Sequence, residues 1–456
     1  MIKRFSARNL PFKSLSGISR LGGLISSVLM SMSSCAEMPA RMLWLEDAKV
    51  RVGLNLDLGG AITWMGPAGS QENLVNNHDW GRQIQMSFYS GPVPFEPNGK
   101  KPKEHWAGLG WNPIQSGDSY NNRSEVLQVN EADGEAHVVC RPMQWPLDNE
   151  PGDCTFESWV RLEQGRVRVK GRLNNARDDR AWYEARSQEL PAVYTNGVYY
   201  RLMTYTGDAP FTGGALERIP QKTEPGFPWK FWHATEHWAA LVNDAGWGLG
   251  VIMPGSTHFV GGFSGKENEG GTKDAPTGYI APLREEVLDH NIVYDFEYVL
   301  ALGTLDEIRR VAEEEAKPGR PPLWRFERDR QGWTFKNARD QGWPVKGALE
   351  VRADGSTPRL LSPVTFWRAE DASKLAITLE AAGEESSLRV CWRRHAQEQF
   401  DEASEIAVAV GGGEGVTTHA VELARAPGYT GGMLQLRLTL PDGMEKLRIR
   451  SIELLP

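Results

Sequence analysis

The chain has 456 residues, which is long enough for two domains with full cores. Its formal net charge of −8, without any tract rich in Lys and Arg, argues against a nucleic-acid-binding protein. Gly-rich turns separate many short β-branched and aromatic runs, so the composition predicts an all-β protein. The 17 tryptophans add a second indication, because this side chain stacks well on the C–H face of a sugar ring.

The N-terminus is typical of an export signal. Basic residues precede the apolar run LGGLISSVLMSM, which is too short to span a membrane. The next four residues, Ser33 to Ala36, resemble a bacterial lipoprotein signal, in which Cys35 would become the first residue and carry lipid. Cleavage after Ala36 without lipid and retention as an anchor are the alternatives. We therefore expect residues 1–36 to be a signal peptide. The mature protein would then be an outer-membrane or surface lipoprotein, or a periplasmic or secreted protein.

Residues 37–315 are expected to form one long antiparallel β domain. The run VRVGLNLDLGGAITWM has the pattern strand, turn, strand, and residues 82–89 alternate between apolar and polar side chains. Farther along, CTFESWVRLEQGRVRVKGRLNN predicts a hairpin with a Gln-Gly turn. Alternate Arg and Lys side chains in its second strand form either a solvated face or a strip that attracts an acidic glycan. Nearby, Cys140 and Cys154 are either a disulfide or two buried thiols.

The segment GGAITWMGPAGSQENLVNNHDWGRQIQ resembles the start of galactose-mutarotase-like domains. In that superfamily an early strand with a Gly-Ala/Gly-hydrophobic pattern precedes the segment where the sugar cleft begins. The resemblance covers residues 45–312 and implies a β-supersandwich fold and a role in handling sugars. The resemblance does not extend to the epimerase signatures of His and Glu, so it assigns no catalytic residue.

Residues 90–122 form a long irregular segment on the β scaffold, and such segments often carry sites. A sugar site needs an apolar face for stacking and a few polar groups to fix hydroxyls, and this segment holds both. The candidate substrate-binding residues here are Trp106, Trp111, Asn112, Gln115, Asp118 and Tyr120. A second irregular segment, the Gly-rich residues 261–284, is a candidate lid.

The stretch RSQELPAVYTNGVYY places Arg186, Gln188 and Glu189 directly before an apolar, aromatic run that includes Tyr194. Charged side chains beside core sequence need partners, either a structural ion pair or a ligand. The structural alternative is a buried ion pair between Arg186 and Glu189. In the functional interpretation Glu189 is catalytic, and the other three side chains bind substrate.

The stretch KFWHATEHWAALVND, residues 230–244, contains His233-x-x-Glu236-His237, the pattern of one class of zinc peptidase. The metal geometry requires a helix, but two prolines stand just upstream and no N-cap residue precedes the run. Two apolar runs joined by Asn-Asp-Ala-Gly predict a hairpin instead. We therefore expect a strand, on which Glu236 points away from both His, and we expect neither a metal nor a cofactor.

Two kinds of chemistry fit these candidates. Hydrolysis of a glycosidic bond needs two carboxyl groups across the sugar. Glu189 and Glu236 are the first pair to test, with Asp118 next.

Elimination from a uronate needs a base such as Tyr or His, and polar groups that neutralise the substrate carboxylate. The candidates for these roles are His233, His237, Tyr194, Arg186 and Gln188. In either case we expect one cleft lined by residues 105–120, 186–194 and 232–238, with Trp232 among the residues that bind substrate.

The run AKPGRPP, residues 316–322, follows an apparent helix and predicts a linker. The remaining residues, 323–456, resemble a carbohydrate-binding jelly-roll module of the galactose-binding type. The resemblance rests on Phe326, Gly332-Trp333, LLSPVTF, the strand pair LAITLE and LRVCWRR, and the closing strand IRSIELL. The alternative is a β-sandwich that only braces the first domain.

Together these features predict an antiparallel β-supersandwich followed by a smaller jelly-roll β-sandwich. The expected function is that of an exported carbohydrate-active enzyme, a glycoside hydrolase or polysaccharide lyase that degrades a polysaccharide. The alternatives are a non-catalytic glycan-binding surface lipoprotein and a sugar epimerase. The expected partners are a polysaccharide or oligosaccharide substrate and, through the lipid anchor alone, a membrane; nucleic acid is not expected.

Overall fold

The computed structural model describes residues 40–221, 228–316, 321–380, 386–410, 415–441 and 446–456. Nearly all regular structure in these residues is antiparallel β-sheet, which confirms the predicted all-β class. The α-helix of the described residues is α1 (Leu305–Ala316), and none of their helices is long and apolar enough to cross a bilayer. The expected signal peptide with Cys35, and residues 317–320 of the expected linker, lie outside the described residues.

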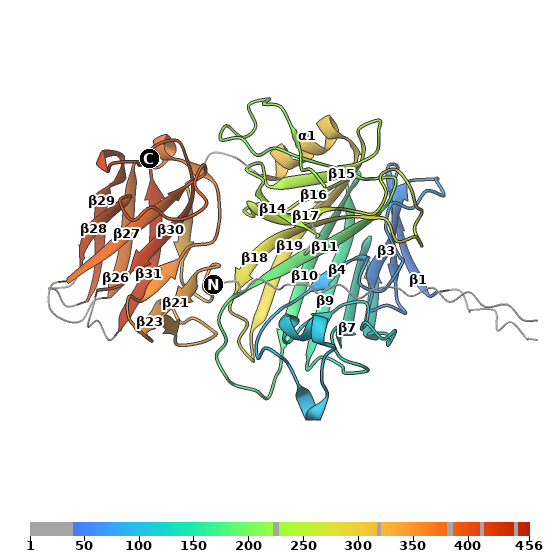
Figure 1. Cartoon of the computed structure of the whole chain (residues 1–456), viewed down its shortest axis with the longest axis horizontal. Coiled ribbons are helices and arrows are strands. Elements are labelled where there is room, and N and C mark those ends of the chain that lie inside the picture. Colours follow the sequence, from blue (N-terminus) through green and yellow to red (C-terminus); the bar gives the residue numbers. More distant parts are fainter. Residues whose placement is uncertain (1–39, 222–227, 317–320, 381–385, 411–414, 442–445) are drawn as a thin grey trace, which may run out of the picture.

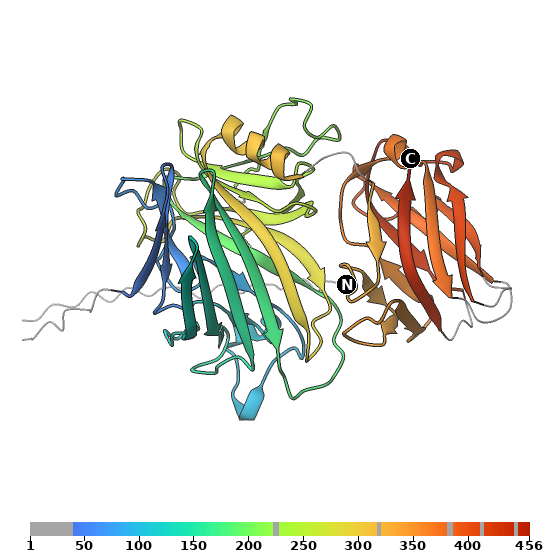
Figure 2. The ribbon, with the colours of Figure 1, turned by 180° about the vertical axis from the view of Figure 1, so that it is seen from behind.

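Two large sheets pack face to face in the N-terminal part of the chain (Figures 1 and 2). Across the ten-stranded sheet the order is β1 (Met42–Glu46), β2 (Val50–Asn55), β3 (Ala61–Pro67), β4 (Ile84–Ser87), β11 (Arg186–Asn196), β18 (Thr277–Glu286), β17 (His258–Ser264) and β14 (Lys230–His233), with β5 (Pro113–Ile114) and β8 (Met143–Gln144) extending from β4. Across the nine-stranded sheet it is β13 (Glu217–Arg218), β12 (Arg201–Thr204), β15 (Trp238–Val242), β16 (Trp247–Ile252), β19 (Val293–Thr304), β10 (Arg166–Asn175), β9 (Cys154–Glu163), β7 (Glu135–Arg141) and β6 (Glu125–Ala132).

The hairpin of β9 and β10 follows the alternation of its sequence. Gln164 and Gly165 at the turn both have positive φ, as a two-residue hairpin with the right twist requires. The basic side chains of β10 are ion-paired: Arg168 lies 2.7 Å from Glu315 of α1, and Arg172 lies 2.6 Å from Asp295 of β19. These pairs give the basic face a structural role in place of the expected alternative, a strip for an acidic glycan.

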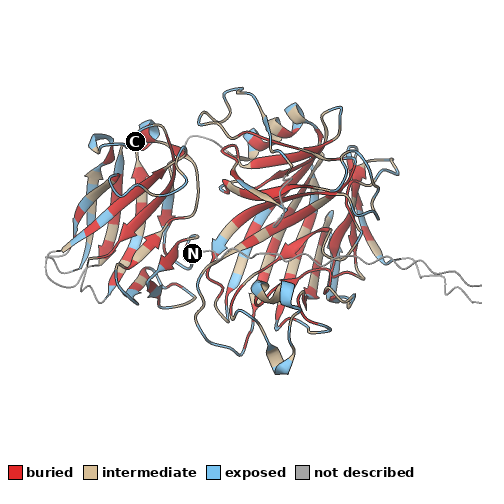
Figure 3. Cartoon of the chain, in the orientation of Figure 1, coloured by how far each residue is buried: buried red, intermediate tan, exposed pale blue. Residues whose placement is uncertain are grey.

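The residues between the two large sheets form the main core, and Figure 3 shows how the buried positions follow the strands. Apolar side chains from both sheets meet there, as expected for sandwiched sheets whose inner faces alternate with their outer faces. Cys140 and Cys154 are part of this core as free, buried thiols. Helix α1 covers part of the opposite face of the nine-stranded sheet, where Ile308 and Ala312 pack against β15, β16 and β19.

The C-terminal residues form a second, smaller pair of sheets with its own core. One sheet has the order β22 (Ala338–Asp340), β23 (Leu349–Ala353), β31 (Leu447–Leu455), β26 (Lys374–Glu380) and β29 (Val416–Glu422), with β20 (Leu323–Arg325) beside β31. The other has the order β21 (Thr334–Lys336), β24 (Arg359–Leu361), β30 (Gly432–Thr439), β27 (Ser386–Arg394) and β28 (Glu405–Val410), with β25 (Trp367–Arg368) beside β30. We call the two sheet pairs the first and the second unit.

Candidate active site on the outer face of the ten-stranded sheet

A bulge in β11 turns Glu189 away from the core. Glu189 pairs with Leu283 of β18 and Val193 pairs with Ile280, so β11 has one extra residue between these two points. Val193 belongs to the core between the sheets, and strict alternation would place Glu189 on that same side. The extra residue reverses the alternation, and Glu189 lies on the face turned away from the nine-stranded sheet. We call this the outer face. Bulges often re-aim a side chain in this way beside active sites.

One row of side chains crosses five neighbouring strands of the outer face. Ser87 of β4 pairs with Glu189, which pairs with Leu283 of β18. The register of β17 against β18 places His258 opposite Leu283, and His258 pairs with His233 of β14. Because adjacent strands lie about 4.8 Å apart, the backbone positions of Glu189 and His258, two strands apart, are separated by about 10 Å across the sheet. The row therefore joins a carboxyl group and two imidazoles on one surface.

Aromatic side chains surround the Glu189 carboxyl. Tyr194 and Tyr279 pair across β11 and β18 and stack with ring centroids 4.6 Å apart, and Trp229 lies 5.0 Å from Tyr279. Burial among these rings raises the pKa of Glu189 to about 7, although the hydroxyls of Tyr279 and Tyr89 lower it. The Tyr279 hydroxyl is buried and has no other hydrogen-bond partner among the described residues. The Glu189 carboxyl can therefore exchange a proton near neutral pH, and aromatic side chains lie beside it.

A second cluster lies where the second unit meets the outer face. We call it the border group, and it consists of His233, His258, Glu285, Arg393 and His395. The rings of His233 and His258 lie 5.7 Å apart, and His395, which follows β27 of the second unit, lies 6.3 Å from His233. Burial, with a smaller contribution from the Arg393 charge, lowers the pKa of His233 to about 3 and that of His258 to about 4. Both imidazoles are therefore neutral at pH 7.

Some of the expected site residues lie on or beside the outer face. Glu189, Tyr194 and His233 share it. Arg186, the first residue of β11, pairs with Glu286 of β18, and its guanidinium donates to the carbonyls of Leu109 at 2.8 Å and Gly108 at 3.0 Å. These contacts replace the ion pair with Glu189 that was the structural alternative, and they tie the 3₁₀ helix Glu104–Leu109 to β11. That helix carries Trp106, which packs against Trp145; Tyr120 lies under the Lys103 ammonium group.

Other expected site residues are structural, which corrects the prediction for them. Glu236 is fully buried, where its carboxylate pairs with Arg309 of α1 at 2.6 Å and accepts a hydrogen bond from the Trp238 indole. Trp232 packs on Phe259 within the core between the sheets. Neither side chain faces Glu189, so Glu236 cannot be its catalytic partner.

The buried residues of the irregular segment also hold the protein together. Trp111 is fully buried and donates to Asp153, so it has no free face for a sugar. The polar groups of the others bond the backbone of neighbouring strands and loops. These residues are Asn112, Gln115, Asp118 and, from β11, Gln188. Their sequence pattern suggested a site because a polar network beneath a loop and a polar binding site use the same residue types.

The H-x-x-E-H stretch is a strand, a turn and a second strand. β14 ends at His233, residues 235 and 236 form the turn, and β15 begins at Trp238 and pairs with β16 in the predicted hairpin. The helix that a zinc peptidase needs is not formed, and the turn separates His237 from His233. His237 lines a cavity between the two units and does not lie on the outer face. Among the described residues, no group of three or more His, Cys, Asp or Glu is arranged to hold a metal ion.

Sequence reasoning missed several residues of this surface. They are Tyr89, Tyr279, His258, Glu285 and Arg393. Glu285 lies on β18, where Tyr279, Ala281 and Leu283 alternate with core residues. That alternation is visible in the sequence and could have placed Glu285 on a strand. No local signal connects Arg393, more than a hundred residues farther on, with this face.

No family model and no curated protein sequence matches this chain. Among solved structures, it is similar to a galactose mutarotase related enzyme from Lactobacillus acidophilus, with 13% identity, a TM-score of 0.35, and coverage of 57% of this chain and 97% of that one. A galactose mutarotase-like protein from Lactobacillus casei gives 13% identity, a TM-score of 0.36, and coverage of 57% and 100%. A GH36 α-galactosidase from Geobacillus stearothermophilus gives 8% identity, a TM-score of 0.32, and coverage of 58% and 40%.

Proposed function

We propose that the protein is an exported, lipid-anchored enzyme that cleaves a polysaccharide on the outer face of the ten-stranded sheet. The observation that carries the proposal is Glu189, a partly exposed carboxyl with a pKa of about 7 beside stacked tyrosines. Such a carboxyl is protonated often enough near neutral pH to donate a proton to a leaving glycosidic oxygen. Tyr194 and Trp229, both partly exposed, offer faces on which a sugar ring stacks.

Glu285 supplies the second carboxyl that hydrolysis needs. It pairs with Ser187 on β11, so it occupies the diagonal position to Glu189 on the same face. Diagonal neighbours on an antiparallel pair lie about 7–8 Å apart. That spacing is between backbone positions, and it lets the two carboxyl groups approach the separation of about 6.5–9.5 Å that leaves room for a water molecule in inverting glycosidases. Glu285 is exposed at the surface of the sheet; partial burial of its carboxyl raises its pKa, and the nearby Arg393 charge opposes that rise and favours the carboxylate that would activate this water.

Elimination is a second candidate chemistry, and the border group favours it. His258 is neutral at pH 7 and therefore able to accept a proton, and Arg393 lies close enough to lower its pKa. Arg393 is nine-tenths buried; among the described residues its guanidinium forms no ion pair within 4 Å, and although burial lowers its pKa, the charge of Glu285 lies near enough to oppose that effect. A buried cation of this kind is suited to neutralise the carboxylate of a uronate, which acidifies the proton next to it.

The test is to incubate the chain without its signal peptide with a panel of plant, algal and microbial polysaccharides. New reducing ends without unsaturation identify a hydrolase, and absorbance from a new double bond identifies a lyase. The variants Glu189→Gln, Glu285→Gln and His258→Gln then assign the roles. Binding without either product would replace the proposal with a glycan-binding lipoprotein, and a change of sugar configuration without cleavage would replace it with an epimerase.

A further inference from the structure

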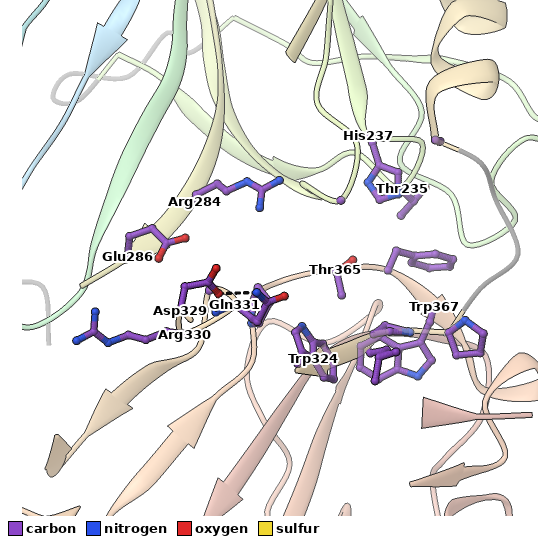
Figure 4. Close-up of a pocket in the computed structure, with 18 of the residues that line it drawn as sticks. Thr235, His237, Arg284, Glu286, Trp324, Asp329, Arg330, Gln331, Thr365 and Trp367 are labelled. Carbon is purple, nitrogen blue, oxygen red and sulfur yellow. Dashed lines mark hydrogen bonds between the residues drawn. The ribbon is translucent and has the colours of Figure 1, made fainter. Parts of the chain in front are cut away.

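A cavity of about 1020 Å³ lies between the two units, apart from the outer face (Figure 4). The first unit contributes Arg284 and Glu286 from β18 and His237 from the turn before β15. The second unit contributes Asp329, Gln331 and Phe366, among others. Arg284 and Glu286 alternate along β18 with Leu283 and Glu285, so they face the opposite side of the sheet from the Glu189 row.

Contacts between the first and the second unit hold the two together beside the cavity, so the cavity is preformed. Arg330 of the second unit is buried and pairs with Asp289 of the first unit at 2.6 Å and with Asp340 of its own unit at 2.8 Å. The Phe366 amide donates to the Thr257 hydroxyl at 3.1 Å. Val287 of the first unit is part of the core of the second. A preformed cavity with few polar groups at fixed positions is the usual form of a ligand site.

Several polar groups that face the cavity keep hydrogen-bonding capacity. The Arg284 guanidinium makes one bond, to the Pro254 carbonyl at 3.2 Å, and its buried Nε has no partner among the described residues. Glu286 is only 8% exposed and accepts one bond, from the Tyr294 hydroxyl at 3.0 Å. Burial raises the pKa of Glu286 to about 7, so this carboxyl both donates and accepts near neutral pH. Figure 4 shows Arg284 and Glu286 directed into the space between the units.

His237 has a strained backbone at the edge of this cavity. Its φ is +62°, in the left-handed region that costs a non-glycine residue free energy. Its Nδ1 lies 3.1 Å from the Ser256 carbonyl, which leaves Nε2 for another partner. Strain of this kind is concentrated at functional sites, where the surrounding structure holds a side chain in place. Phe366 and Trp343, both partly exposed, add aromatic faces.

The charges in the cavity are mixed: four arginines and four carboxyl groups line it, namely Arg284, Arg328, Arg330, Arg368, Glu286, Asp295, Asp329 and Asp371. A lining of donors, acceptors and aromatic faces with no excess of either charge suits an uncharged polyhydroxyl ligand. The volume is at the upper end of the range of about 300–1,000 Å³ for small-molecule pockets, so it accommodates more than one sugar ring. A small gap adjoins both the outer face and the cavity. It is lined by Glu285 and His258 of the outer face and by Arg284 and Glu286 of the cavity.

We infer that the cavity between the units binds a neutral oligosaccharide segment, at a site separate from the Glu189 carboxyl. The inference rests on the proposed function, because the segment would belong to the glycan that the outer face cleaves. The adjoining gap has a volume of about 30 Å³, room for a few water molecules and not for a sugar ring, so a bound glycan would pass from the cavity to the outer face over the protein surface. The second unit then contributes to substrate binding through Phe366 and Gln331, residues outside the strands that form its core.

The test uses the full mature chain carrying Glu189→Gln, so that no ligand is consumed. Isothermal titration measures the binding of cellotetraose, xylotetraose, mannotetraose and laminaritetraose. At least one should bind, and adding Arg284→Met or Phe366→Ala should weaken that binding at least tenfold. Arg310→Met, on the exposed side of α1, is the matched control and should bind as the parent does. Thermal melting verifies that each variant is folded.

The outcomes separate the two proposals. If none of the four tetrasaccharides binds, or if both cavity variants bind as tightly as the parent, the inference is overturned. If binding depends on Arg284 and Phe366 but the wild-type protein cleaves no polysaccharide, the cavity site stands and the proposed catalysis fails. A Phe366→Ala variant that melts normally keeps the test valid even if Arg284→Met is unstable.

Discussion

Glu189 and Glu285 lie on one face of the ten-stranded sheet, at diagonal positions on the neighbouring strands β11 and β18. The bulge in β11 produces this relationship, because without the extra residue Glu189 would point into the core. Glu189, with a pKa of about 7, is about half protonated at neutral pH, and Glu285 is exposed to solvent. Glu189 would be the acid and Glu285 the base that glycoside hydrolysis uses. This combination replaces the pair of Glu189 and Glu236 expected from the sequence.

The first prediction concerns this pair. Glu189→Gln and Glu285→Gln should each lower kcat on the cleaved polysaccharide by at least 100-fold, because each removes one partner of the proton transfer. Each variant should leave the melting temperature at pH 6 within a few degrees of the wild type. Glu422→Gln, an exposed carboxylate of β29, is the matched control and should be fully active. Full activity in both site variants would contradict the prediction, because it would show that neither carboxyl takes part in cleavage.

The second prediction is the pH dependence of stability that Glu189 causes. Its pKa is about 7 in the folded protein and near 4.5 in the unfolded chain, so the folded state holds this proton between those pH values. Wild-type stability should therefore fall relative to Glu189→Gln as pH rises from about 4.5 to about 7, and the difference should then stay constant. Urea unfolding of both proteins from pH 4 to pH 8 measures it. A constant difference across that range would show that the Glu189 pKa is not raised.

The third prediction concerns acid. The folded-state pKa values of His233 and His258, about 3 and 4, lie below the ordinary value of 6.5, so the unfolded chain takes up protons first. Both residues should cost stability progressively as pH falls from about 6.5 toward 4. His258→Gln should reduce this loss, whereas His105→Gln, on the exposed 3₁₀ helix, should not. Chemical denaturation at a series of pH values checks the difference, and NMR titration of the two imidazoles checks its cause.

The fourth prediction tests the structural role of Glu236. Arg309→Met should lower the free energy of unfolding by about 3–5 kcal/mol, because it leaves the fully buried Glu236 carboxylate without its counter-charge. Arg310→Met, at the next position of α1, removes an exposed guanidinium and should change stability by about 0.5 kcal/mol or less. Equal effects of the two substitutions would mean that the buried pair does not stabilise the fold.

The fifth prediction concerns export. Wild-type protein should partition with membranes, and Cys35→Ala should release or mislocalise it, because the lipid would be attached at that residue. Mature bacterial lipoproteins carry more than one acyl chain, so the anchoring should be firm. Membrane fractionation and metabolic labelling with palmitate measure both properties. Wild-type protein found wholly in the soluble fraction would contradict the lipid anchor.

Local patterns in the sequence determined the all-β class and the individual hairpins. The Gln164-Gly165 turn and the run from Trp238 to Ile252 form the predicted hairpins, because period-two alternation and turn chemistry act over neighbouring residues. The same reasoning indicated correctly that the H-x-x-E-H stretch is not a helix. A charged group beside an aromatic run also pointed to Glu189 and Tyr194, which lie on one face of the sheet; their role in a site stays a prediction.

Only the tertiary structure decided which of these residues share a surface. One extra residue in β11 sets the direction of Glu189, and alternation cannot reveal a bulge because the register depends on the partner strands β4 and β18. Glu236 became structural because Arg309, 73 residues later, packs beside it. Arg393 reaches the border group from the second unit. Pairing between distant segments depends on how the sheets stack, and no local periodicity encodes that information.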